Sequence, residues 1–157
     1  MSTTPCDIYI SMENQQKAGE VLRHYYDTRY FGDKAMRDPW VWVKLGPISF
    51  PSPNLRGRRE IIHLHDLHHI LTGYDTDWAG EGEVAAWELA SGFPKGYRVG
   101  YLYAPITFCI GLIVAPRRLI QAFRRGLGKK NLCHLRLEKN QLLSMPIDDL
   151  KRALSLN

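Results

Sequence analysis

Two histidines and a glutamate in one stretch of the chain have the spacing of a metal-binding motif. An H-D-x-x-H sequence places His65 and His69 four residues apart, and Glu81 follows after eleven intervening residues. On an α-helix, side chains four residues apart lie on one face, so both imidazoles can direct a ring nitrogen at one ion. Two nitrogens and a carboxylate oxygen suit Zn²⁺ and leave a coordination position open for water or substrate. We therefore predict a divalent metal site, with Zn²⁺ as the expected ion and Fe²⁺ or Mn²⁺ as alternatives.

Asp66 is the acidic residue inside this motif. At about 100° per residue, it lies roughly a quarter-turn around the helix from His65. Asp66 is therefore predicted as a further metal ligand, as a partner that orients a ligating histidine, or as the catalytic base that acts on bound water.

The neighbouring polar residues are expected to lie outside the metal site. His63 and His68 fall on other sides of the predicted helix, so neither is expected to be a ligand. Glu83 competes with Glu81 for the carboxylate position, but Glu81 is better placed at the start of the next helix.

Three other kinds of site share parts of the motif. A zincin protease uses H-E-x-x-H, and here Asp66 replaces the glutamate base with a side chain one methylene shorter. An HD-type phosphohydrolase needs an earlier helical histidine and a distant aspartate, and His63 is too close to be that histidine. A closed structural zinc site needs a fourth protein ligand, which Cys133 or His134 would have to supply.

The spacing of apolar residues predicts a mostly helical chain. Helices are expected over about residues 14–30, 55–71, 81–90, 116–127 and 146–154. Gly73 is expected to end the second of these, and the short connection that follows should pack Glu81 close to His69. Prolines and a β-branched run predict a short extended segment near residues 40–50. The sequence therefore predicts an all-α fold, a single compact domain over residues 1–157 with the motif core at 55–95.

Residues 99–116 form an apolar run without a charged side chain. A membrane-spanning helix needs about 20 such residues, and this run also contains prolines and glycines. We expect a buried central helix here. A membrane span and a helix that lines a lipid pocket or dips into a membrane surface are the alternatives.

The composition is that of a globular protein with a basic excess. The chain has 157 residues, of which 45% are hydrophobic, and a formal net charge of +5. The basic residues concentrate between 117 and 130, where a solvated helix face is expected and an anionic membrane surface is an alternative. Nucleic acid is not expected as a partner. Three widely spaced cysteines and no recognisable secretory signal predict a cytoplasmic protein, alternatively one peripheral to the inner face of the membrane.

The spaced motif resembles that of the coenzyme Q biosynthesis protein four family. The resemblance rests on the H-D-x-x-H element, the Thr72-Gly73 pair inside the spacer, and Gly80 before Glu81. Residues 122–126, Glu138 and residues 145–154 are similar to the C-terminal pattern of bacterial members. The resemblance therefore covers about residues 55–156.

The family resemblance implies a function in ubiquinone biosynthesis. It implies an all-helical fold, a metal held by His65, Asp66, His69 and Glu81, and oxidative decarboxylation of a polyprenylated ring precursor, whose C1 carboxyl is replaced by a hydroxyl. The alternative is a non-catalytic scaffold that binds the prenylated intermediate for other biosynthetic enzymes. Expected partners are that precursor, other ubiquinone-biosynthesis proteins, a membrane surface and a second copy of the chain. Residues proposed to line the prenyl site are Tyr101, Tyr103 and Phe108, for each of which core packing is the competing explanation.

Overall fold

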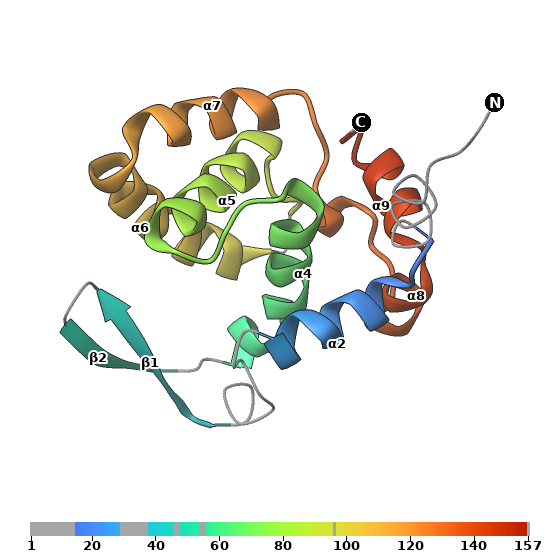
Figure 1. Cartoon of the computed structure of the whole chain (residues 1–157), viewed down its shortest axis with the longest axis horizontal. Helices are drawn as coiled ribbons and strands as arrows, with labels where there is room; N and C mark the ends of the chain where they lie inside the picture. The colour runs from blue at the N-terminus through green and yellow to red at the C-terminus, as the bar shows by residue number, and fades with distance from the viewer. Residues whose placement is uncertain (1–14, 29–37, 46–47, 54–55, 96, 157) are drawn as a thin grey trace, which may run out of the picture.

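The fold is mostly helical, which confirms the predicted all-α class. The structure is a computed structural model and describes residues 15–28, 38–45, 48–53, 56–95 and 97–156. The helices are α2 (Ala18–Thr28), α4 (Arg56–Thr72), α5 (Trp78–Ser91), α6 (Arg98–Val114), α7 (Pro116–Gly126), the 3₁₀ turn η1 (Leu132–His134), α8 (Lys139–Ser144) and α9 (Ile147–Ala153). Figure 1 shows α5 among α4, α6 and α7, with α2, α8 and α9 on the other side of α4.

Helix α5 is the central helix of the molecule. Its small residues, including four alanines and two glycines, allow α6 and α7 to pack closely on it. A Cβ atom on Gly82 would lie 2.5 Å from the Cα of Gly111, so α5 and α6 cross with their backbones in contact. The prediction that residues 99–116 form the buried central helix is therefore wrong. Helix α6 covers α5 and leaves apolar side chains such as Ile106 and Ile113 exposed.

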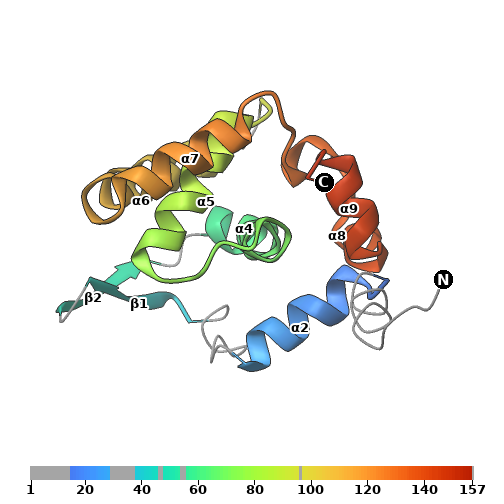
Figure 2. The ribbon, with the colours of Figure 1, turned by 45° about the horizontal axis from the view of Figure 1, so that its top comes forward.

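Helices α2 and α9 pack against α4, and α8 packs against α2, on the side away from α6 and α7 (Figure 2). The backbone N–H of Ala18 donates to the carbonyl of Met145 at 2.8 Å, which joins the start of α2 to the end of α8. Asn131 is fully buried and donates to the carbonyl of Gly92 at 2.7 Å. The segment after α7 is thus fastened to the C-terminal end of α5.

An antiparallel pair of β-strands lies between α2 and α4 in the sequence. Strands β1 (Trp40–Leu45) and β2 (Ile48–Pro53) pair from Trp40↔Pro53 to Leu45↔Ile48. Proline lacks a backbone N–H and is tolerated in a two-stranded hairpin because both strands are edge strands. This hairpin confirms the extended segment predicted near residues 40–50.

The described helices include none that is both long enough and apolar enough to cross a membrane. Helix α6 comes closest in composition, but it has 17 residues with Pro105 inside it. The membrane-span alternative for residues 99–116 therefore finds no support in the described part of the chain.

Candidate metal centre

Three of the predicted ligands converge on one point between α4 and α5. The Nε2 atoms of His65 and His69 lie 3.3 Å apart, and the Glu81 carboxylate lies 3.3 Å from the first and 3.4 Å from the second. One ligand atom from each residue fits within 4.8 Å of the others. These are the separations expected when donor atoms surround one ion about 2 Å from each of them. The structure thus brings together the two nitrogens and the carboxylate oxygen of the sequence motif.

The other ring nitrogen of each histidine contacts an oxygen that only accepts hydrogen bonds. Nδ1 of His65 lies 3.1 Å from a carboxylate oxygen of Glu88, and Nδ1 of His69 lies 3.2 Å from the carbonyl of Tyr74. Both Nδ1 atoms must therefore carry a hydrogen, and both Nε2 atoms are left as lone-pair donors when the rings are neutral. Two lone pairs facing each other need a cation between them, so the donor set fits a divalent metal. Histidine ligands in metalloproteins are oriented in this way.

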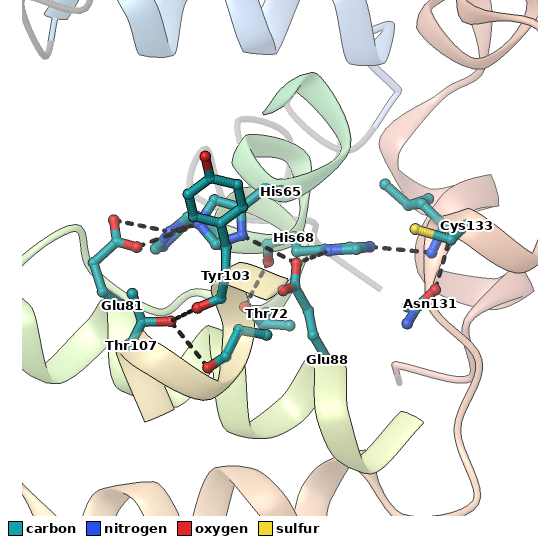
Figure 3. Close-up of polar contacts among 12 residues, drawn as sticks. His65, His68, Thr72, Glu81, Glu88, Tyr103, Thr107, Asn131 and Cys133 are labelled. Atoms are coloured by element: carbon teal, nitrogen blue, oxygen red, sulfur yellow. Dashed lines mark hydrogen bonds and ion pairs between the residues drawn. The ribbon is translucent and has the colours of Figure 1, made fainter. Parts of the chain in front are cut away.

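Glu88 is a residue of the candidate site that the sequence prediction missed. It lies seven residues after Glu81 on α5, which is about two helical turns and places both carboxylates on the same face. The side chain is buried, and the same oxygen accepts from His65 and, at 2.7 Å, from Nδ1 of His68 (Figure 3). The seven-residue spacing of the two glutamates was the signal that could have identified it.

His68 connects the candidate metal centre to the C-terminal segment. The backbone N–H of Leu132 donates to Nε2 of His68 at 3.1 Å, so the imidazole hydrogen must be on Nδ1, facing Glu88. Burial lowers the pKa of His68, which keeps the ring neutral. His68 was not expected to be a ligand, and it does not belong to the group of His65, His69 and Glu81. Its role is to orient Glu88.

The charges of the site are strongly coupled. Burial by itself would raise the pKa of Glu88, but the charge of His65 and hydrogen bonds from both histidines lower it to about 2. The pKa of Glu81 is likewise lowered, because its hydrogen bonds with His65 and His69 outweigh the effect of burial. In the same way, the two glutamates raise the pKa of His65 well above its usual value despite burial. Without a metal, a proton on His65 therefore supplies the positive charge between the two carboxylates.

Asp66 lies beside the candidate metal centre but is not among the converging atoms of His65, His69 and Glu81. Its carboxylate accepts a hydrogen bond from the hydroxyl of Tyr26 at 2.7 Å. Burial raises the pKa of Asp66, although the nearby His65 opposes this shift. The contact with Tyr26 ties α2 to α4 next to the site, and the ligand role of Asp66 stays a prediction.

The loop between α4 and α5 sets the position of Glu81. Gly73 follows the last residue of α4 with φ of 76°, and its turn directs the carbonyl of Tyr74 back to His69. The side chain of Asp77 caps α5 by accepting from the N–H of Gly80 at 2.7 Å. A Cβ on Gly80 would lie 2.0 Å from the carbonyl oxygen of Asp75, so only glycine allows this close approach. Helix α5 consequently begins at Trp78, earlier than the predicted residue 81.

Other residues considered from the sequence lie away from the ligand cluster. Glu83 is buried and pairs with Arg118 at 2.5 Å, in agreement with the choice of Glu81 over Glu83. Burial and the charge of Glu88 raise the pKa of Cys133 to about 12, so it is a thiol and a poor metal ligand. His134 contacts the side chain of Asn131 at 3.2 Å. Neither Cys133 nor His134 belongs to the ligand group found among the described residues.

The three candidate lipid-contacting residues of α6 differ in exposure. The Tyr101 ring is exposed, and its hydroxyl donates to the carbonyl of Phe93 at 2.9 Å. Tyr103 is half-buried, and Phe108 packs against the apolar cores on both sides of it. Core packing therefore accounts for the buried part of the Phe108 side chain. A lipid contact by these three residues stays a prediction.

Comparison of the chain with protein-family models, with curated proteins and with solved structures found no match. The geometry of the His65, His69 and Glu81 cluster is therefore the structural observation that bears on function.

Proposed function

We propose that this protein binds one divalent metal ion through His65, His69 and Glu81 and acts on a polyprenylated ring precursor of ubiquinone. The observation that carries the metal proposal is the convergence of two Nε2 atoms and a carboxylate, with both Nδ1 atoms already bonded to acceptors. The assignment of the ring substrate rests on the resemblance of the spaced motif to that of the ubiquinone-biosynthesis family. The proposed reaction replaces the C1 carboxyl by a hydroxyl: the carboxyl leaves as CO₂, water supplies the hydroxyl oxygen, and O₂ accepts the two electrons and becomes H₂O₂.

The side chains around the cluster are suited to an open and reactive metal centre. Three protein ligands of mixed nitrogen and oxygen type leave coordination positions free, whereas structural zinc sites are closed by four. The side chain of Glu81 is about one quarter exposed at 28%, so substrate can approach from this side, while Glu88 and His69 are enclosed. Buried Glu88 and the Tyr74 carbonyl hold the two rings in fixed orientations.

Asp66 is proposed to hold or relay a proton beside the substrate. Its raised pKa favours the protonated form more than that of an ordinary aspartate, and the Tyr26 hydroxyl fixes one of its oxygens. When bound, the metal would supply a Lewis acid or, if it is Fe²⁺ or Mn²⁺, redox chemistry. Two histidines and one carboxylate are found both in zinc hydrolases and in non-haem iron oxygenases.

Two alternatives remain in the same geometry. The metal could anchor the head group of a prenylated intermediate on a non-catalytic scaffold, with catalysis supplied by partner enzymes. Alternatively, the two histidines and the glutamate from the following helix would serve a zincin-like metallohydrolase, in which Asp66 would act as the base. Metal identity bears on the choice, because Zn²⁺ is redox-inert and an ion that itself activates O₂ for the oxidation would have to be Fe²⁺ or Mn²⁺.

Product analysis with a prenylated hydroxybenzoate tests the reaction. Metal-loaded wild-type protein should release CO₂ and form the ring hydroxyl, and Asp66→Asn should keep its metal but lose at least about a hundredfold in rate. Full metal content and full ubiquinone production by His65→Ala and Glu81→Ala in a strain that lacks the gene would refute the proposal. Peptide hydrolysis that Asp66→Asn abolishes would instead establish the hydrolase. Substrate binding without turnover by any metal form would favour the scaffold.

A further inference from the structure

Helix α7 carries two apolar faces, and only one of them is buried. Leu119, Ala122 and Gly126 face the core. Ile120 and Phe123 repeat the spacing of Leu119 and Ala122 one residue later, yet both are exposed. Leu127, which directly follows the helix, is 55% exposed. At about 100° per residue, this second stripe lies roughly a quarter-turn from the buried face. Its apolar area has no covering element in the described part of the chain.

Helix α6 carries a second stripe with the same spacing. Ile106, Cys109 and Ile113 are exposed, Ile113 to 84%, which is the largest exposure of any large apolar side chain described. This stripe lies roughly opposite the buried positions Ala104 and Gly111. The rings of Phe108 and Phe123 meet at 6.4 Å and join the two helices. We call the two stripes together the α6–α7 surface; Figure 2 shows these helices side by side.

The segment of the chain that carries the α6–α7 surface contains basic residues and no acidic ones. Residues 89–137 contain nine of the 21 lysines and arginines and none of the 16 acidic residues. On α7, the exposed Arg117 and Arg124 lie roughly a quarter-turn from the exposed stripe, on the side away from the core. Apolar side chains flanked by arginines are the pattern of a helix that lies in the head-group region of an anionic membrane.

We propose that the α6–α7 surface docks this protein on an anionic lipid bilayer. The apolar side chains would enter the boundary between head groups and acyl chains, and Arg117 and Arg124 would lie at the phosphates. The proposal adds to the metal centre a route by which a prenylated substrate, which resides in the bilayer, reaches the protein. It rests on the exposed side chains and their charge, and not on the proposed reaction.

A second copy of the chain fits this surface less well. A twofold contact would place the α6–α7 surfaces of both copies face to face. The arginines of the two copies would then be brought together, and residues 89–137 supply no carboxylate to neutralise them. Like charges at an interface oppose association, whereas lipid phosphates neutralise the same charges.

Vesicle sedimentation tests the proposal with the full chain. Wild-type protein should bind phosphatidylcholine vesicles that contain phosphatidylglycerol, and binding should weaken without the anionic lipid or at high salt. Ile113→Glu should weaken binding by at least about tenfold, since a buried isoleucine is worth about 2 kcal/mol. Leu137→Glu is the matched control, because it also replaces an exposed apolar residue but lies beyond both helices.

A second pair of variants tests the cationic part of the surface. The double variant Arg117→Gln and Arg124→Gln should lose about thirtyfold in affinity, from about 1 kcal/mol for each arginine near the surface. The exposed pair Arg23→Gln and Lys139→Gln removes equal charge elsewhere and should have a smaller effect. Equal losses in the test and control variants, or no binding to anionic vesicles, would overturn the proposal. So would a wild-type dimer that Ile113→Glu converts to a monomer without changing vesicle binding. Metal content, measured in parallel, should be unchanged in all four variants and separates this test from that of the metal centre.

Discussion

At the scale of single residues, the candidate centre is defined by hydrogen bonds that leave each imidazole one useful orientation. Glu88 accepts from His65 and His68 with one oxygen, and the Leu132 N–H fixes the hydrogen of His68 on the side of Glu88. A buried carboxylate is costly unless it is paired and hydrogen-bonded. Glu88 is therefore held by the same two histidines that it orients. A substitution of Glu88 should weaken metal binding more than it destabilises the fold.

Replacing Glu88 by glutamine should weaken metal binding by about ten- to hundredfold, the usual cost of losing a partner that orients a ligand. The amide keeps the size of the side chain but removes the charge that His65 and His68 share. Affinity would be measured by competition with a chromogenic chelator. The control is Glu83→Gln, a buried glutamate of the same helix that pairs with Arg118 instead. Equal losses of metal affinity in both variants would contradict the role assigned to Glu88.

Metal binding should release about one proton at neutral pH. The pKa of His65 is raised well above its usual value in the metal-free protein, because the charge and hydrogen bonds of the two glutamates outweigh burial. A metal ligand must be deprotonated, so the ion displaces this proton. Affinity therefore rises with pH as long as the pH is below the pKa of His65. Calorimetry in buffers of different ionisation enthalpy measures the proton, and heats that are independent of the buffer would contradict the account.

At the scale of elements, the sequence predicted the helices that carry the motif and the position of Glu81 near His69. Helical spacing placed α4 to within a residue at each end. The start of α5 was predicted three residues late, because Asp77 caps the helix from within a loop that also contains other capping residue types. The role of Gly80 could not be read from the sequence, since it depends on the backbone of Asp75 lying against it.

Gly80→Ala should lower both thermal stability and metal affinity. The added methyl would lie 2.0 Å from the Asp75 carbonyl, so the start of α5 must move and take Glu81 with it. Gly92→Ala is the control at the other end of α5. There φ is 73° and ψ is 156°, a conformation that glycine adopts far more readily than alanine, and the Cβ meets no atom within 4 Å. Roughly 1–3 kcal/mol of stability should therefore be lost and metal affinity kept. Thermal melts with chelator titrations measure both effects, and unchanged metal affinity in Gly80→Ala would contradict the account.

At the scale of the whole molecule, the prediction of the central helix from hydrophobicity alone was wrong. Residues 99–116 are the more apolar run, yet α5 occupies the centre because its alanines and glycines allow two helices to approach it. Apolar composition does not distinguish a helix covered on all sides from one that exposes a stripe, and exposed apolar side chains are common on protein surfaces. The contacts of Glu88 and Leu132 with His68 are equally long-range and became visible only in the fold.

Metal analysis of the purified protein tests the central claim most directly. The account predicts one divalent ion per wild-type chain and little or none in His65→Ala, His69→Ala and Glu81→Ala, each with its helical circular dichroism retained. Glu83→Gln, measured alongside, should keep the ion because its carboxylate pairs with Arg118. Wild-type protein that takes up no divalent ion, or Glu81→Ala protein that binds it as tightly as wild type, would contradict the assignment of this cluster as a metal centre.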